Sequence, residues 1–240
     1  MRRRVRFRAV VGLPFLLGLA MPGGSVETAE PKSDAESALR SLSAHVVERS
    51  DPQALEVALG AYYRYRSEHP DLVHKPYFYY VDLGLSPGTP RGYVFDMDRL
   101  ELVEGPFTVA HGSGSSPTRD AIPSVFSNAS GSHASSLGLY LTRETYAFSG
   151  RSGGRAYTSI GLRLRGESGR FNDAAETRGI VVHGAPYVTA AGAGRSEGCP
   201  AMEPERAARL LPLLAGGAVV LVYSPNDEGW LREGRWVRAE

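Results

Sequence analysis

The sequence predicts a mainly β, α+β domain that is preceded by short helices and contains one further helix near its end. Aromatic and β-branched residues gather in short segments from about residue 75 onwards, as expected of strands. Before that point, two segments carry apolar residues at helical spacing. The 28 glycines and 16 prolines indicate many turns, and 42% hydrophobic residues are enough for a core.

Residues 1–25 are predicted to be a secretory signal peptide. Five arginines precede a short apolar run, and small, turn-forming residues follow it. The run is shorter than the about 20 apolar residues of a membrane-spanning helix. A basic helix on the membrane surface and an uncleaved anchor are the alternatives. Loss of this segment leaves 27 − 5 = 22 basic residues against 26 acidic ones, so the net charge changes from +1 to −4.

Residues 26–74 are predicted to form a linker and a helical segment. The part over 26–36 is polar and reads as the linker. Apolar spacing predicts one helix over 37–49, and Asp51-Pro52 is a typical start for a second helix that runs to about Glu68. Because two short amphipathic helices bury little surface on their own, we expect them to pack on the following domain.

Residues 75–240 are predicted to form the β-rich domain. Strands are expected over 77–83, 92–97, 100–111 with an interruption at Gly105-Pro106, 137–142, 159–164, 180–183, 219–223 and 235–238. A helix is expected from Glu203 to Leu214, and Gly216-Gly217 closes it. The stretch over 112–136 is rich in Ser, Gly, Pro and Asn and has no periodicity. Such long loops are uncommon in compact domains and are often functional.

The single cysteine, Cys199, excludes an intrachain disulfide, a CxxC zinc site and an iron–sulfur cluster. The net charge of +1 argues against a dedicated nucleic-acid binder. The polar segment from Arg195 to Pro200 surrounds the cysteine, which favours a loop that presents a thiol to solvent. An inert, buried cysteine is the alternative. In the first case, the nearby Arg195 favours the thiolate.

His183 is the candidate base for that thiol. A free cysteine has a pKa near 8.5 and is only a few per cent thiolate at neutral pH, so a nucleophilic cysteine needs a base within hydrogen-bond reach. His183 ends an apolar strand segment and Gly184 follows it. Fifteen residues separate it from Cys199, which is enough for a loop that turns back beside the strand. This spacing alone is a weak signal, because most lone histidines at strand ends are structural.

The two segments together resemble the active-site signature of L,D-transpeptidases. That signature is a histidine and a glycine, a gap of about fifteen residues, and then Ser/Thr-x-Gly-Cys, and here the last part is Ser196-Glu197-Gly198-Cys199. Over residues 55–224 the chain is similar to the murein L,D-transpeptidase catalytic domain (YkuD-like). The other segments that carry the resemblance are Tyr79-Tyr80-Val81-Asp82, Arg91-Gly92-Tyr93-Val94, Val109-Ala110-His111-Gly112-Ser113, Phe126-Ser127-Asn128, Ser135-Ser136-Leu137-Gly138, Leu162-Arg163-Leu164 with Asn172, His183-Gly184-Ala185-Pro186-Tyr187-Val188 and Gly194-Arg195-Ser196.

The resemblance implies a β-sandwich or barrel catalytic domain outside the cytoplasm that acts on peptidoglycan stem peptides. Cys199 takes the nucleophile position and His183 the base position. The carbonyl of Gly184 orients the histidine, and the backbone N–H groups of Gly198 and Cys199 form the oxyanion hole. The cysteine forms a thioester with a stem tetrapeptide, expels the terminal D-residue and passes the acyl group to an amine or to water. The family uses no cofactor or metal in this reaction and is commonly acylated by carbapenems.

Ser196 matches the Ser/Thr of the signature and is a third candidate, with Gly198 and Gly184, for the oxyanion hole or for orientation. The candidates for substrate binding are Arg195, His111, Gly112, Ser135, Ser136 and Tyr187. Many family members carry Arg or Asn two residues after the cysteine, where this chain has Ala201, and Arg195 is the candidate to replace that group. Glu197 is expected to face solvent, because a carboxylate that pointed inward would raise the pKa of the thiol.

Four functions remain open, and the transpeptidase is favoured. With water as the acceptor, the same site is an L,D-carboxypeptidase. A zinc-dependent cell-wall hydrolase would use His111, His133, His183 and Cys199 as ligands. A non-catalytic wall-binding module would leave the cysteine unused. In every case we expect an exported protein, periplasmic or cell-wall associated, with peptidoglycan stem peptides as partner, no nucleic acid and no stable membrane span after signal cleavage. The sequence leaves the oligomeric state open.

Overall fold

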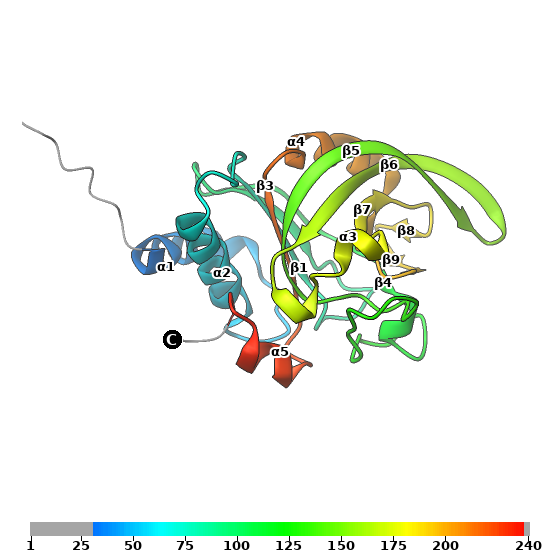
Figure 1. The fold of residues 1–240 in the computed structure, drawn as a ribbon, viewed down its shortest axis with the longest axis horizontal. Coiled ribbons are helices and arrows are strands. Elements are labelled where there is room, and N and C mark those ends of the chain that lie inside the picture. The colour runs from blue at the N-terminus through cyan, green and yellow to red at the C-terminus, as the bar shows by residue number, and fades with distance from the viewer. Residues whose placement is uncertain (1–30, 238–240) are drawn as a thin grey trace, which may run out of the picture.

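The computed structural model describes residues 31–237, in which strands predominate (Figure 1). The helices are α1 (Pro31–Leu42), α2 (Ala54–Glu68), α3 (Ala175–Arg178), α4 (Pro204–Leu214) and α5 (Glu228–Glu233). The strands are β1 (Tyr77–Asp82), β2 (Gly92–Asp96), β3 (Glu101–Phe107), β4 (His111–Gly112), β5 (Gly138–Ser152), β6 (Arg155–Gly166), β7 (Val181–Gly184), β8 (Val188–Thr189), β9 (Gly192–Ala193), β10 (Arg195–Ser196), β11 (Ala201–Met202) and β12 (Val219–Tyr223). The predicted signal peptide lies outside the described residues.

Eight of these strands form one mixed sheet in the order β11-β7-β6-β5-β12-β1-β2-β3. Two small pairs, β10 with β4 and β8 with β9, accompany it. The predicted mixed, mostly β fold is therefore confirmed. The predicted barrel alternative is wrong, because the eight-stranded sheet does not close on itself: β11 and β3 are its edge strands. Ala201 on β11 is joined to Ala110, which follows β3, by an isolated bridge and not by a strand pairing.

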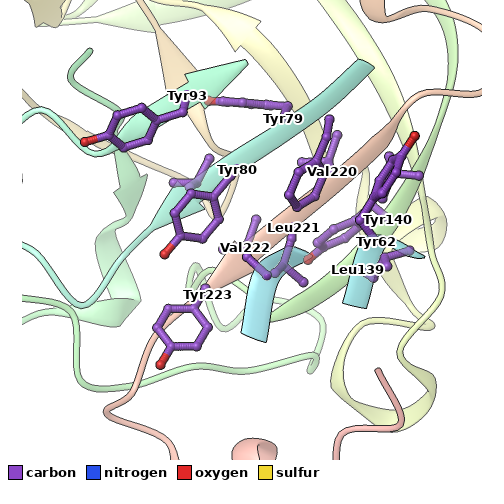
Figure 2. Packing of buried hydrophobic residues seen from close by; sticks show 14 of the residues in the cluster. Tyr62, Tyr79, Tyr80, Tyr93, Leu139, Tyr140, Val220, Leu221, Val222 and Tyr223 are labelled. Carbon is purple, nitrogen blue, oxygen red and sulfur yellow. The ribbon is translucent and has the colours of Figure 1, made fainter. Parts of the chain in front are cut away.

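The core lies around the middle of the sheet. Every residue of β12 is buried, and this strand pairs parallel with β1 and antiparallel with β5. Its run of valine, leucine and tyrosine suits a strand that is covered on both faces. Figure 2 shows side chains from α2, β1, β5 and β12 in this cluster. The side chain of Tyr62 on α2 is fully buried, and its ring centroid lies 5.2 Å from that of Phe78 on β1.

The first N-terminal helix differs from the prediction at both ends, whereas the second ends at Glu68 as predicted. Residues 31–36, predicted as linker, already belong to α1, with Pro31 at its first position, where the fixed φ of proline suits a helix start. The helix expected over 37–49 instead ends at Leu42 and continues as a 3₁₀ turn, η1 (Ser43–His45). Both α1 and α2 contribute to the main core, as we expected from their amphipathic pattern.

The longest strands of the described residues are β5 and β6, of which the sequence predicted only the inner parts. They form one hairpin whose turn is Gly153-Gly154, with φ values of 55° and 79° that favour glycine in a two-residue turn. In Figure 1 this hairpin arches away from α1 and α2, over the side that carries β7 and β8. Its outer part alternates aromatic residues with exposed polar ones, and that polarity hid the strands from the sequence analysis.

Two further expectations need correction. The strand expected over 235–238 is absent from the described part of that segment, where residues 235–237 form a turn after α5. The strand expected over 100–111 is divided, because β3 continues through Gly105-Pro106 but ends at Phe107, and β4 joins a different pair. Within residues 31–237, no helix has the length and apolar character needed to cross a membrane.

Candidate active site

Cys199 lies in the tight loop between β10 and β11. Ser196 closes this loop with its hydroxyl, which donates to the Cys199 carbonyl at 2.6 Å and accepts from the Gly198 N–H at 3.2 Å. Gly198 has a φ of 125°, which favours glycine at this position. Its N–H is thus occupied within the loop, contrary to its predicted place in an oxyanion hole. The Cys199 N–H, by contrast, has no hydrogen-bond acceptor among the described residues.

The thiol of Cys199 is partly exposed and protonated at rest. Its Sγ lies 3.8 Å from the carbonyl oxygen of Gly179, to which it donates. Burial raises the pKa of the thiol, while the Val181 N–H and the Arg178 guanidinium oppose that effect. Because the raised pKa leaves little thiolate at neutral pH, a nucleophilic role needs a base.

His183 lies on β7 beside the cysteine loop. In the parallel pairing of β7 with β11 it stands opposite Ala201, and its N–H donates to the Pro200 carbonyl at 3.4 Å. Its ring is buried, and its Nδ1 lies 3.1 Å from the Gly184 carbonyl oxygen. Burial lowers its pKa, so the ring is neutral at pH 7.

This geometry assigns the tautomer of the ring. A carbonyl can only accept, so Nδ1 of His183 carries the proton and Nε2 offers its lone pair. Among residues 31–237, Nε2 makes no hydrogen bond, and the thiol and the imidazole do not yet bond to each other. Catalytic hydrogen bonds are often long or absent before substrate binds. The arrangement therefore provides a neutral base on the strand that pairs with the segment directly after the protonated thiol.

An aromatic wall stands against His183, and the sequence analysis missed most of it. Phe148 from β5 stacks on the imidazole, with ring centroids 4.1 Å apart and planes 14° apart. The ring of Tyr187 meets the same imidazole edge-on at 6.5 Å, and Tyr157 from β6 meets Tyr187 at 6.4 Å. Tyr187, a predicted substrate-binding residue, therefore lies beside the candidate base. The alternation of aromatic residues after 142 was the signal that could have revealed this wall.

His111, a predicted substrate-binding residue, lies in the interior instead, where it cannot contact a substrate. It is fully buried, with Nδ1 at 3.0 Å from an Arg91 nitrogen and Nε2 at 2.8 Å from Ser116 Oγ. Burial and the nearby Arg91 and Arg195 lower its pKa to about 3, so the ring is neutral. Since Arg91 can only donate, Nδ1 accepts and Nε2–H donates to Ser116. Through these two contacts the His111 ring connects β4 to Arg91 and to Ser116.

Gly112, Ser135 and Ser136 are also buried, and they join segments rather than line a surface. Ser135 Oγ accepts from the Gly112 N–H at 2.9 Å and donates to the Gly198 carbonyl at 3.0 Å. A side chain on Gly112 would collide with the backbone of His133. Ser136 Oγ lies 2.8 Å from the Tyr140 hydroxyl. These contacts connect the long polar loop to the cysteine loop.

The prediction that Arg195 favours the thiolate is wrong, because Arg195 is not among the groups that act on the pKa of the thiol. Its guanidinium donates to the carbonyls of Ser113 and Ser116, at 3.4 and 3.1 Å, and so holds the first turn of the polar loop. Ala201 is fully buried between two strands, which leaves no room there for a long polar side chain. The side chain of Glu197 is 77% exposed and forms an ion pair with His133, so the expectation that it faces solvent is confirmed.

Arg178 is a residue of the site that the sequence analysis did not single out. It is the basic residue that lowers the pKa of the thiol. It ends α3, directly before the left-handed Gly179 and the strand that carries His183. Its position, a basic residue between a helix and a glycine, was the signal that the sequence offered.

The residues of the zinc hypothesis do not come together. Both ring nitrogens of His111 face Arg91 and Ser116, and His133 pairs with Glu197 at the surface. In the described part of the chain, no group of three or more His, Cys, Asp and Glu side chains is arranged to hold a metal ion.

Comparisons with known proteins agree with the resemblance in the sequence. Residues 47–223 match the family described as L,D-transpeptidase catalytic domain. No curated protein matches the chain. Similar solved structures include an L,D-transpeptidase from Stackebrandtia nassauensis, with 15% identity over 82% of this chain and 94% of that one and a TM-score of 0.38. Another is an L,D-transpeptidase from Mycobacterium smegmatis, with 15% identity over 62% of this chain and 58% of that one and a TM-score of 0.37.

A third structure, residues 123–326 of an L,D-transpeptidase from Xylanimonas cellulosilytica, has 13% identity over 62% of this chain and 61% of that one, with a TM-score of 0.37. The chain thus spans about three-fifths of the length of the Mycobacterium smegmatis structure. The family match covers most of the chain, and the assignment to a family rests on it alone. This protein belongs to the L,D-transpeptidase catalytic domain family.

Proposed function

We propose that the protein is a peptidoglycan L,D-transpeptidase that works through a Cys199 thioester. The observation that carries the proposal is the orientation of His183. Its Nδ1–H is held by the Gly184 carbonyl, so the free lone pair lies on Nε2, on the strand that pairs with the segment after Cys199. Membership of the L,D-transpeptidase family supports peptidoglycan peptides as the substrate class.

The acylation step begins with the transfer of the thiol proton from Cys199 to His183 Nε2. The sulfur then attacks the carbonyl carbon of the third residue of a stem tetrapeptide. The negative charge that develops on the carbonyl oxygen needs a donor, and the Cys199 N–H is available for it. When the tetrahedral intermediate collapses, the bond to the terminal D-residue breaks. The leaving amine takes the proton from His183, and a thioester remains on the sulfur.

The acceptor decides between transpeptidation and hydrolysis. An amine of a second stem loses a proton to His183 as it attacks the thioester, and the thiol is regenerated with a new amide bond. With water in the same place, the product is a free tripeptide and the enzyme is an L,D-carboxypeptidase. Phe148 and Tyr187 place aromatic rings against the buried imidazole of His183, with Tyr157 against Tyr187, and we expect this apolar surface to disfavour water as the acceptor.

Intact-mass analysis after incubation with a stem tetrapeptide tests the thioester. We expect a mass increase equal to the tetrapeptide minus its terminal D-residue, and no increase for Cys199→Ala. Circular dichroism of the variant checks that it is folded. Because Cys199 is the only cysteine, any adduct that survives in the variant contradicts the proposal. Acylation of Cys199 by a carbapenem is a second expected mass change.

Product analysis tests the acceptor. With a diamino acid added, we expect a cross-linked product to exceed the free tripeptide. If the tripeptide is the only product at all acceptor concentrations, the carboxypeptidase is correct.

We also propose that the protein is exported. Mass spectrometry of the N-terminal peptide, measured on protein that the host has exported, tests this. If that peptide still begins at residue 1, the predicted removal of the signal peptide is wrong.

A further inference from the structure

Arg178 occupies a junction between the polar loop and the cysteine loop. It is the last residue of α3, and the next residue, Gly179, ends that helix in the left-handed conformation with a φ of 68°. The short helix α3 packs against β6, and the chain leads from it into β7, the strand that carries His183 (Figure 1). The chain that leaves α3 reaches the thiol directly, through the Gly179 carbonyl and the Val181 N–H.

The guanidinium of Arg178 binds four acceptors in a single stretch of the polar loop. One terminal nitrogen donates to the Ser127 carbonyl at 2.7 Å and to Ser136 Oγ at 3.3 Å. The other donates to the Ala134 carbonyl at 2.8 Å and to Ser132 Oγ at 3.2 Å. The planar fork of an arginine can serve four acceptors in this way, whereas a lysine cannot.

All four acceptors are neutral. Among residues 31–237, no carboxylate forms an ion pair with Arg178, so hydrogen bonding satisfies its donors while its charge is not cancelled by a neighbour. Arginine keeps its proton under all ordinary conditions. A permanent positive charge therefore remains at this junction.

That charge lies against the residue that precedes the cysteine. One terminal nitrogen of Arg178 is 3.5 Å from the point where a Cβ on Gly198 would stand. The Ala134 carbonyl, which this nitrogen holds, is 3.1 Å from the same point. The Gly198 carbonyl also accepts a hydrogen bond from Ser135 Oγ at 3.0 Å, so two residues of the same loop, Ala134 and Ser135, contact Gly198.

We propose that Arg178 is a positioning residue for the nucleophile, which holds the loop over 127–136 against Gly198 and keeps a positive charge against the residue that precedes Cys199. The inference rests on the proposed function for its meaning in turnover. Its effect on the thiol does not, because a nearby cation stabilises a thiolate toward any electrophile. The lowering of the thiol pKa by Arg178 agrees with it.

The pH dependence of Cys199 alkylation by iodoacetamide tests the charge. The only cysteine gives a single reaction site, so mass spectrometry reports its rate directly. In Arg178→Gln we expect the midpoint of the profile to move to higher pH and the rate at pH 7 to fall by about three- to tenfold, since one pKa unit changes the thiolate fraction about tenfold. Arg178→Lys keeps the charge, and its rate should stay within about threefold of the native rate.

Arg170→Gln is the matched control, because Arg170 is an exposed arginine near the same loop that pairs instead with Glu233. Its profile should superimpose on that of the native protein. A folded Arg178→Gln variant with an unchanged profile overturns the proposal. If that variant does not fold, Arg178→Lys decides: faster hydrogen exchange over 127–136 is expected, and unchanged exchange with unchanged alkylation overturns the proposal.

The two proposals fail separately. Alkylation needs no peptide, so a shifted profile with no acylation by the stem tetrapeptide removes the transpeptidase and leaves the role of Arg178. Acylation by the tetrapeptide together with an unshifted profile does the opposite.

Discussion

Two buried histidines, His111 on β4 and His183 on β7, stand in contrasting surroundings. Both are almost inaccessible to solvent, and burial lowers the pKa of both. His111 has a partner on each ring nitrogen, Arg91 on one side and Ser116 on the other. His183 has one partner, the Gly184 carbonyl, and its second nitrogen is open.

The difference shows what makes a buried histidine useful as a base. A neutral imidazole offers one donor and one acceptor, and a general base must keep the acceptor free. At His111 the acceptor is taken by a cation, which further disfavours protonation. At His183 a carbonyl takes the donor and leaves the acceptor. The same side chain is therefore structural in one place and chemically available in the other.

The largest expected effect comes from removing the open nitrogen. His183→Gln should lower the rate of acylation by the stem tetrapeptide by about 10²–10⁴-fold, the usual range for loss of a general base. The variant should still fold, because the backbone pairing of β7 stays, although the ring's hydrogen bond to the Gly184 carbonyl and its stacking on Phe148 are lost. Stopped-flow acylation and thermal unfolding measure the two effects. A variant with native acylation rates would break the comparison.

The reverse pattern is expected at the other histidine. His111→Leu leaves the fully buried Arg91 without one of its acceptors, and we expect a loss of about 2–3 kcal/mol in the free energy of unfolding. The protein that remains folded should still be acylated. Urea unfolding gives the stability, and acylation is measured in the folded fraction. A stable variant that cannot be acylated would instead place His111 in the reaction.

The pH dependence of stability provides a third test. In the folded state the pKa of His111 is about 3, against about 6.5 when unfolded. Between these values the unfolded chain binds more protons, so stability is complete above pH 6.5 and falls as the pH decreases toward 3. The slope attributable to one such histidine is about 1.4 kcal/mol per pH unit. His111→Leu should show a shallower slope than the native protein over this window, and equal slopes would contradict the assignment.

Much of the fold could be predicted because its signals are local. The strand at 219–223 has the predicted ends, since a continuous apolar run is buried on both faces. The outer part of the β5–β6 hairpin could not be predicted, because its side chains alternate between partly buried aromatic residues and residues that are exposed to solvent. The ends of α1 likewise depend on packing against other elements. Local propensity carries little information about such positions.

The site was predictable only in part, for a related reason. The spacing of His183 and Cys199 indicated a loop that turns back beside the strand, and the two segments are neighbours in the structure. It could not distinguish Arg195 from Arg178 as the cation near the thiol, because both are basic residues close to the motif. The distinction depends on which carbonyls each guanidinium reaches, and those belong to a loop some 50 to 80 residues away in the sequence. For the same reason, sequence alone placed the buried His111 at the surface.

The smallest expected effect concerns a third histidine, His133, and its exposed partner. Glu197 is two residues from the thiol and contributes the least of the causes that act on its pKa, in the direction that raises it. Glu197→Gln should therefore speed alkylation of Cys199 at pH 7, but by less than about twofold, since exposed charges are strongly screened by water. The difference should vanish at about 1 M salt, where the Debye length is about 3 Å. An acceleration that persists at high salt, or one reproduced by His133→Gln, would mean that this surface pair is coupled to the thiol by structure rather than by charge. In that case, solvent exposure would no longer distinguish the role of His133 from the roles of the two buried histidines.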